Sequence, residues 1–337
     1  LFPYTTLFRS QISTNGMKQL LSAPASNQTF GLQAMTEEIH ATFQIESIHS
    51  SRNSIRHILN GYAPRNEEES RIYGMKRGLD FIANRQNTIT EENLHQLYQI
   101  STGDYLPDED RLLPDRFYRH DVVYVVGGEA SREGLPAQQL PEAMKRLVDF
   151  ANAKDGINEL HKAAILHFAF AYYHPYFDGN GRTARLLHLW YLVQQGYPAA
   201  LFTPFSRYIA ESKAAYYKSY DRVEKNALIS GYTDVTPFLS YFCNEVYNRL
   251  QVDVTPPQAD LQIYQAALSE GKITEKERLL WEYVLSAYGA EEFTTKQLEK
   301  DFRNAAYATI RTFVMKFHEM GLLMARKAGN RIFYKVN

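Results

Sequence analysis

The sequence of 337 residues has almost no cysteine, a formal net charge of only −1 and no long apolar run. The single cysteine, Cys243, excludes an intramolecular disulfide framework and a zinc site built from cysteines, and it favours a reducing, cytoplasmic setting. We expect it to be a small buried residue on a helix. No apolar stretch approaches the ~18 residues of a membrane span, so we expect no membrane partner. With 45% hydrophobic residues, the composition is that of a globular protein rather than a tail or fibre.

The first ten residues, LFPYTTLFRS, look like an in-frame translation of a sequencing adapter. We therefore leave residues 1–10 out of the fold prediction. The remaining length is sufficient for two to three domains.

Apolar residues recur at helical spacing along most of the chain, which predicts a mainly α protein. The helices are expected over 14–59 with a break at 22–31, and over 67–84, 90–100, 141–153, 157–173, 181–195 and from 206 to about 250. Asn60 and Gly61 supply a stop signal after the first region. The polar, turn-rich residues 102–115 predict a loop.

A clear β signal interrupts these helices. The run of Val122, Val123, Tyr124, Val125 and Val126 is followed by two glycines, which predicts a strand and a turn. A short hairpin among helices is more plausible as an exposed flap with an unpaired edge than as core.

The C-terminal part shows a different pattern. Two prolines without periodicity at 251–260 predict a linker. Helices are expected over 261–270 and 275–288, followed by a helix, a turn, a longer helix and two short strands. This order over 261–337 predicts a small winged helix-turn-helix domain.

The stretch HPYFDGNGRTAR, residues 174–185, gathers polar groups between two apolar helices. His174 stands where the preceding helix ends, because Pro175 cannot continue it. Gly179, Asn180 and Gly181 form a tight turn that feeds the next helix, and a helix N-terminus with free backbone N–H groups favours anions.

The charged side chains of this stretch suit a polyphosphate. Arg182 and Arg185 are three residues apart on one helix face, and their forked donors fit phosphate oxygens. Asp178 is a hard oxygen ligand for Mg²⁺, and His174 is the candidate general base. Phosphates, metal and base together imply attack on a phosphorus atom. The alternative, a structural joint with a capping aspartate, does not account for all these residue types together.

The pattern H-P-[FY]-x-D-G-N-G-R-x-x-R resembles the signature of the Fic family of protein adenylylating enzymes, with Tyr176 in place of the usual phenylalanine. The resemblance covers residues from about 30 to 250. It implies a Fic-type helical bundle with a β-hairpin flap. The expected division is an N-terminal helical region over 11–90, a catalytic core over 91–250, the linker and the winged helix-turn-helix.

The resemblance also implies the roles of the residues. His174 would deprotonate a target Tyr, Ser or Thr hydroxyl, which attacks the α-phosphate of ATP. Asp178 would hold Mg²⁺, and the turn from Gly179 through Asn180 to Gly181 would form the anion hole. Arg182 would bind the β-phosphate region and Arg185 the γ-phosphate. Residues Val122–Val126 would hold the target segment by strand addition.

The family often carries an inhibitory helix with the pattern [ST]-x-x-x-E-[GN]. The segment TFQIES places Thr42 and Glu46 at this spacing, with Ser47 where glycine or asparagine is usual. A Glu46 carboxylate bound to Arg185 would take the place of the γ-phosphate. The other interpretation is an ordinary surface glutamate on an amphipathic helix.

Several functional alternatives remain open. Residues 294–337 hold nine Lys or Arg and three Asp or Glu, a net of +6, so we favour DNA as a partner over a protein-docking or dimer-forming role for the winged helix. The chain could instead be an ATP-sensing regulator or antitoxin-like binder, although a sensor has no need of His174. The same site could also remove AMP or transfer another phosphate-linked group. We expect His161, His167 and His188 to be structural.

Overall fold

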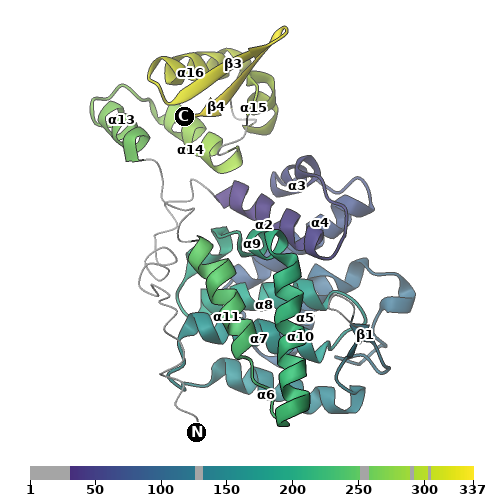
Figure 1. Cartoon of the computed structure of the whole chain (residues 1–337). Helices are drawn as coiled ribbons and strands as arrows, with labels where there is room; N and C mark the ends of the chain where they lie inside the picture. The colour runs from purple at the N-terminus through teal and green to yellow at the C-terminus, as the bar shows by residue number, and fades with distance from the viewer. Residues whose placement is uncertain (1–30, 126–131, 251–257, 289–291, 303–304) are drawn as a thin grey trace. The chain divides into compact units, whose positions relative to one another are not determined.

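The computed structural model describes residues 31–125, 132–250, 258–288, 292–302 and 305–337. The described residues 36–250 belong to one compact unit and residues 258–337 to a second (Figure 1). The adapter-like segment at 1–10, the helix expected from residue 14 and all but the last residue of the break at 22–31 lie outside the described residues. No described helix is both long and apolar enough to cross a membrane.

The first unit is almost entirely helical, which confirms the mainly α prediction. The β-hairpin consists of β1 (Tyr124–Val125) and β2 (Arg132–Glu133), paired antiparallel. The helices are α2 (Gly31–Ile45), α3 (Arg52–Leu59), α4 (Glu67–Ala83), α5 (Glu91–Ser101), α6 (Leu140–Asn152), α7 (Glu159–Tyr173), α8 (Asn180–Gln194), α9 (Phe205–Glu211), α10 (Lys213–Ser230) and α11 (Thr236–Tyr241). A π-helical turn at Phe242–Asn248 follows, and 3₁₀ turns lie at Gly103–Tyr105, Asp108–Asp110, Ala137–Gln139 and Pro198–Phe202.

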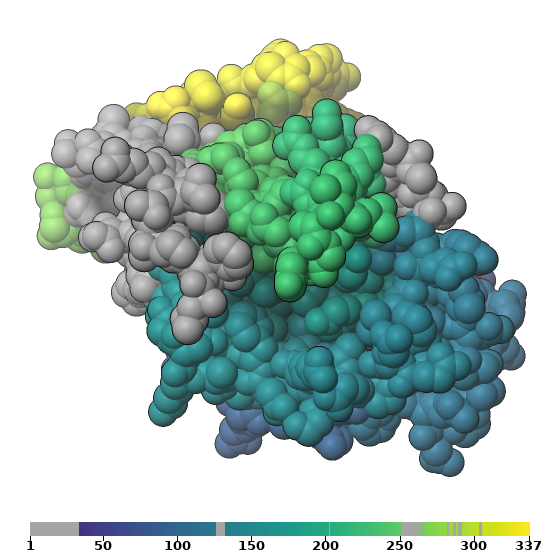
Figure 2. Space-filling model, turned by 60° about the horizontal axis from the view of Figure 1, so that its bottom comes forward, coloured from purple at the N-terminus to yellow at the C-terminus, as the bar shows by residue number. Residues whose placement is uncertain are grey.

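The centre of this unit is the α7–α8 pair. α8 is buried on every side over most of its length, which matches the apolar run from Leu186 to Val193, interrupted by His188 alone. α4 and α5 pack against α8, while α6 and α11 pack against α7. Figure 2 shows the surface on which the green residues of α10 and α11 lie over the teal residues of the earlier helices. The turn between α7 and α8 is therefore held by a rigid core.

The structure differs from the predicted elements in four places. The helical region expected up to residue 59 is interrupted between Ile45 and Arg52, where Ser47 has a left-handed φ of 58°. The helical stretch from 206 to about 250 is broken at Ser212 and at Gly231, whose φ of 72° ends α10 in a left-handed conformation. The described part of the predicted strand 122–126 is shorter, because only Tyr124 and Val125 are paired. The predicted linker is also shorter, since α13 already begins at Gln258.

The second unit has its own core. Its elements are α13 (Gln258–Ser269), α14 (Glu275–Ala287), α15 (Thr295–Phe302), α16 (Tyr307–Glu319) and the antiparallel hairpin of β3 (Leu323–Ala328) and β4 (Arg331–Val336). Phe293 pairs with Tyr334 as a third, one-residue strand. The apolar faces of α14 and α16 close around Leu280, Val284, Ile310 and Phe313, all fully buried.

Candidate active site

The turn that joins α7 to α8 carries the HPYFDGNGRTAR motif in a tightly determined conformation. His174 caps α7 with a left-handed φ of 55° and ψ of 60°. Gly179 caps the N-terminus of α8 with a φ of 81°, and a Cβ at this position would collide with Thr102. Glycine is therefore required at 179 both by its backbone conformation and by close packing.

Asn180 fixes the middle of this turn. Its side-chain oxygen accepts from the backbone N–H of Tyr176 at 2.9 Å, and its Nδ2 donates to the Tyr176 carbonyl at 2.8 Å. The Asn180 side-chain amide therefore binds the backbone of the turn. The groups of this segment that can bind an anion are the backbone N–H groups at the start of α8.

His174 is prepared to accept a proton. Burial lowers its pKa to about 4, so the imidazole is neutral at neutral pH. Nδ1 lies 3.3 Å from the carbonyl oxygen of Ala171. A carbonyl can only accept a hydrogen bond, so Nδ1 carries the proton and Nε2 keeps its lone pair. This is the protonation state that a general base needs.

Arg182 and Arg185 supply buried positive charge at the start of α8. Both residues are 3% exposed. Nη2 of Arg182 donates to Asp178 Oδ2 at 2.9 Å, whereas Nε of Arg182 and Nη1 of Arg185 have no hydrogen-bond partner within the described residues. A buried donor without an acceptor costs about 1–3 kcal/mol. Such donors beside a helix N-terminus fit a phosphate group.

Glu46 lies in this anion site. Its Oε1 accepts from Nη2 of Arg185 at 2.6 Å, and a Cβ added to Gly181 would collide with the same carboxylate. Thr42, one turn earlier on α2, accepts from Nε of Arg185 at 2.5 Å through its hydroxyl and from Nη2 at 3.2 Å through its carbonyl. A carboxylate therefore rests on the first turn of α8, where the helix dipole favours negative charge.

The end of α2 holds Glu46 in this position. Glu46 follows the last helical residue, and Ser47 adopts a left-handed φ of 58°. The Ile48 N–H donates to the Phe43 carbonyl at 2.9 Å, and the Ser47 N–H donates to the Gln44 carbonyl at 3.1 Å. This is a Schellman motif, in which glycine or asparagine is the usual left-handed residue.

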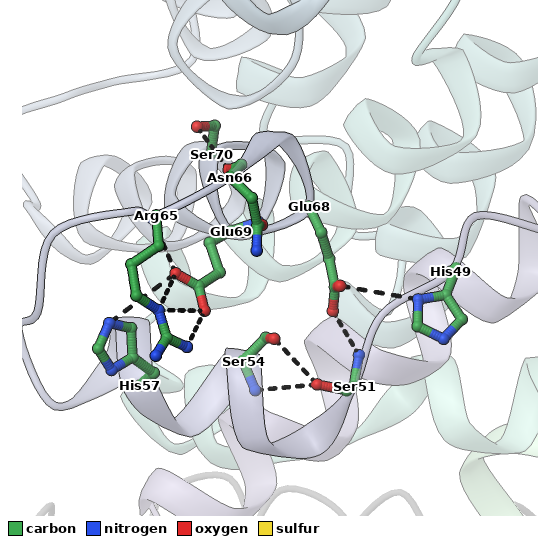
Figure 3. Close-up of polar contacts among 9 residues, drawn as sticks. All are labelled: His49, Ser51, Ser54, His57, Arg65, Asn66, Glu68, Glu69 and Ser70. Carbon is green, nitrogen blue, oxygen red and sulfur yellow. Dashed lines mark hydrogen bonds and ion pairs between the residues drawn. The ribbon is translucent and has the colours of Figure 1, made fainter.

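The segment after Glu46 is tied to α4 by the polar network in Figure 3. The Ser51 N–H donates to Glu68 at 2.7 Å, while the Ser51 hydroxyl caps α3. The carboxylate of Glu69 is fully buried, accepts from Nε of Arg65 at 3.0 Å and lies 3.8 Å from His57. The chain on the C-terminal side of Glu46 is thereby anchored.

A second buried carboxylate anchors the other side of Glu46 and was missed in the sequence. Glu38 is 4% exposed and accepts from the Ser206 N–H at 2.8 Å and from the Ser206 hydroxyl at the start of α9. Burial raises the pKa of Glu38. Glu38 precedes Thr42 by four residues and Glu46 by eight, so all three side chains lie on one helix face. This spacing is visible in the sequence and could have identified Glu38.

Asp178 is the candidate metal ligand. Its side chain is 53% exposed, Oδ1 accepts from the Gly179 N–H at 2.6 Å, and Oδ2 meets Arg182. No group of three His, Cys, Asp or Glu residues in the described chain could hold a metal ion by itself. Mg²⁺ commonly binds through one or two carboxylates together with substrate phosphates and water. A single exposed carboxylate beside a buried anion site fits that chemistry.

The base of the flap lies near His174, since a Cβ added to Gly134 would contact both Val123 and His174. Val122 and Tyr124 are 55% and 65% exposed, Val123 and Val125 are half-buried, and Val126 lies outside the described residues. Arg132 of β2 donates from Nη2 to the Ala171 carbonyl at 3.3 Å and pairs with Glu224 of α10 at 3.1 Å. The hairpin base is thus attached to both α7 and α10.

Two of the histidines expected to be structural, His167 and His188, have tyrosine partners. Nε2 of His167 lies 2.9 Å from the Tyr216 hydroxyl, and Nε2 of His188 lies 2.8 Å from the Tyr247 hydroxyl. Burial lowers the pKa of His161. Cys243 is fully buried, as expected, and burial raises the pKa of its thiol to about 12.

The fold and the site define the class of this domain. Residues 88–192 match the model of the Fic/DOC family, so the chain contains a Fic/DOC family domain. A crystal structure of a Fic family protein from Desulfovibrio desulfuricans G20 shares the fold, with a TM-score of 0.62 at 16% identity over 100% of this chain and 98% of that one.

Curated relatives with similar sequences are named protein adenylyltransferases. Protein adenylyltransferase fic-1 of Caenorhabditis elegans is 32% identical over 181 residues, which cover 52% of this chain and 31% of the relative. Protein adenylyltransferase Fic of Culex quinquefasciatus is 26% identical over 184 residues, 53% of this chain and 32% of the relative. The matched segment thus spans about a third of the length of these relatives.

Proposed function

We propose that the chain is a protein adenylyltransferase, which transfers AMP from ATP to a Tyr, Ser or Thr hydroxyl of a protein and is restrained by Glu46. The observation that carries this proposal is the buried anion site on the first turn of α8, next to a neutral His174 and in contact with the Glu46 carboxylate. The names of the relatives support the reaction class. The chain itself is one candidate substrate.

The residues of the turn would bind the triphosphate. The backbone N–H groups of Asn180 and Gly181 would donate to phosphate oxygens, while Gly179, whose N–H is bonded to Asp178, would supply the backbone conformation of the turn. Arg182 would bind the β-phosphate region and Arg185 the γ-phosphate. Asp178 would hold Mg²⁺, which when bound neutralises phosphate charge.

The transfer step follows from the position of His174. The target hydroxyl gives its proton to Nε2 as its oxygen forms a bond to the α-phosphorus. The bond from that phosphorus to the oxygen bridging to the β-phosphate breaks, so pyrophosphate leaves and AMP remains on the target. The negative triphosphate would raise the His174 pKa from its value of about 4, which makes the base stronger when ATP is bound. The exposed edge of β1 would hold the target by strand addition.

Glu46 would prevent this step by competition. A γ-phosphate and the Glu46 carboxylate require the same donors of Arg185, and two anions cannot share that place. ATP would then bind with its phosphates displaced from the productive arrangement.

The test is incubation with ATP labelled on the α-phosphorus, with Mg²⁺ and with wild type, Glu46→Gly and Glu46→Gly/His174→Ala. We expect label on the protein chiefly in Glu46→Gly. Label in none of the three, with ATP still bound, would instead support a nucleotide sensor. Loss of label from a premodified target would support AMP removal.

We also propose that the second unit is a winged helix-turn-helix that binds DNA. Its order of helix, single-residue strand, two helices and a β3–β4 hairpin supports this architecture. Among the described basic residues of 294–337, Lys316 pairs with Glu277 at 2.8 Å and Arg326 pairs with Glu292. The positive charge available to phosphates is therefore smaller than the count in the sequence. Fluorescence anisotropy with duplex DNA over a series of salt concentrations tests the proposed DNA binding, because contacts with DNA phosphates weaken steeply as the salt concentration rises. Salt-independent or absent binding would favour protein docking.

A further inference from the structure

Arg119 has an unusual environment at the base of the flap. The residue is 2% exposed, and burial lowers the pKa of its guanidinium. A buried charge is costly unless hydrogen bonds compensate it. The compensation here comes from backbone carbonyl groups.

These carbonyls belong to three different segments. Nε donates to the carbonyl of His174 at 2.7 Å. Nη1 donates to the carbonyl of Asp121, before β1, at 2.5 Å, and Nη2 donates to the carbonyl of Leu135, after β2. One guanidinium therefore joins the start of the flap, its end and the catalytic turn.

Backbone hydrogen bonds reinforce the same junction. The Arg119 N–H donates to the Pro175 carbonyl at 2.9 Å, so the backbone and the side chain of Arg119 together bind the carbonyls of two consecutive residues, His174 and Pro175. The Leu135 N–H donates to the Tyr173 carbonyl at 3.2 Å. A Cβ at Gly134 would come within 2.7 Å of Nη2 of Arg119 and 3.4 Å of the His174 Cβ, which shows how closely the flap passes the base.

The His174 backbone needs such support. Its left-handed conformation costs a residue with a side chain roughly 1–2 kcal/mol. Strained conformations persist where the surroundings over-determine them, commonly at active sites. A charge-assisted bond to the His174 carbonyl fixes the orientation of the strained peptide.

We propose that Arg119 is a positioning residue for the transfer reaction, holding the His174 backbone in its left-handed conformation and fixing the flap relative to the imidazole. Arg119 acts through His174 and the flap rather than on ATP. This inference rests on the proposed function, because the flap and His174 act together only if a target hydroxyl must be presented to the base.

The test uses the full chain with Glu46→Gly as the parent and adds Arg119→Ala, Arg119→Lys or, as a matched control, Arg146→Ala on the exposed face of α6. For Arg119→Ala we expect kcat for label transfer to fall by ~10²-fold, the size of effect that a small misplacement of a base produces. The KM for ATP should stay within about twofold, because Arg119 does not contribute to the anion site. Arg146→Ala should match the parent.

Two further measurements separate positioning from stability. Millimolar guanidinium ion should restore part of the kcat of Arg119→Ala, which a merely destabilised protein would not show. An NMR titration of the His174 imidazole should give a higher pKa in Arg119→Ala than in the parent, because a nearby positive charge is lost.

A folded Arg119→Ala with the kcat of the parent would overturn the proposal. The proposal would also fail if the kcat of Arg119→Ala falls, guanidinium does not restore it and the pKa of His174 is unchanged. If Arg119→Ala does not fold, Arg119→Lys decides by kcat and by the KM for ATP, since it keeps the charge and loses the fork; a kcat equal to that of the parent would then overturn the proposal. If the parent transfers no label, the proposed function has failed, and the NMR titration still decides whether Arg119 controls His174.

Discussion

Replacing Glu46 with alanine should destabilise the first unit when nucleotide is absent. The Arg185 side chain is 3% exposed and that of Glu46 is 28% exposed, and their contact distance is 2.6 Å. Breaking a buried ion pair from one side costs about 3–5 kcal/mol. Glu46 is partly exposed and Thr42 still accepts two bonds from Arg185, so we expect the free energy of unfolding to fall by about 2 kcal/mol.

ATP should reverse this loss in the variant. A ligand at 100 times its Kd stabilises by about 2.7 kcal/mol. The γ-phosphate would replace the missing carboxylate at Arg185, so ATP should stabilise Glu46→Ala more than ADP does. In the wild type, where the carboxylate occupies that place, the two nucleotides should differ little.

Urea unfolding followed by tryptophan fluorescence measures both effects. Trp190 of α8 is fully buried, and its fluorescence reports on the first unit. Trp281 belongs to the second unit, so it is replaced by phenylalanine in all the proteins compared, including the wild-type reference. Glu142→Ala, which removes an exposed pair with Arg146, is the matched control and should change stability by less than about 1 kcal/mol. Equal stability of Glu46→Ala and wild type, with the same response to ATP and ADP, would refute the contact between Glu46 and Arg185.

Ser47→Gly should raise the free energy of unfolding by up to about 1 kcal/mol, because glycine adopts the left-handed conformation without strain. The same substitution should reduce basal label transfer. A fall in the free energy of unfolding would contradict the role of the residues that end α2. Gly134→Ala should lower kcat, because its Cβ would press on Arg119 and Val123; a parent-like rate would show that the flap base tolerates displacement. Burial lowers the pKa of His188 to about 3, and its unfolded pKa is about 6.5. The unfolded state therefore binds the proton between these values, and stability should fall by about 1.4 kcal/mol per pH unit as the pH drops below 6.5; a flat urea midpoint from pH 7 to 5 would contradict this.

Local sequence patterns were sufficient for the parts of the site that neighbouring residues determine. Pro175 and Gly179 mark the end of α7 and the start of α8, and helical spacing places Arg182 and Arg185 together. The contact of Glu46 with Arg185 spans 139 residues, and it was expected from a family resemblance rather than from spacing.

Other features depend on tertiary packing that no local pattern describes. Arg119 is a single basic residue before a strand, and its importance appears only when three carbonyls from distant segments converge on it. The break of the helical stretch near Gly231 was missed because the periodicity on both sides is helical, whereas a left-handed glycine ends α10. Sequence periodicity identifies faces of helices and does not identify their partners.

The position of the transferred phosphorus tests the central claim most directly. Glu46→Gly is incubated in parallel with ATP labelled on the α-phosphorus and with ATP labelled on the γ-phosphorus, and the protein is then isolated and its label measured. We predict that α-label stays on the protein, that γ-label leaves as pyrophosphate, and that His174→Ala abolishes the α-label. Retention of γ-label, or equal α-label with and without His174, would contradict adenylyl transfer by this site.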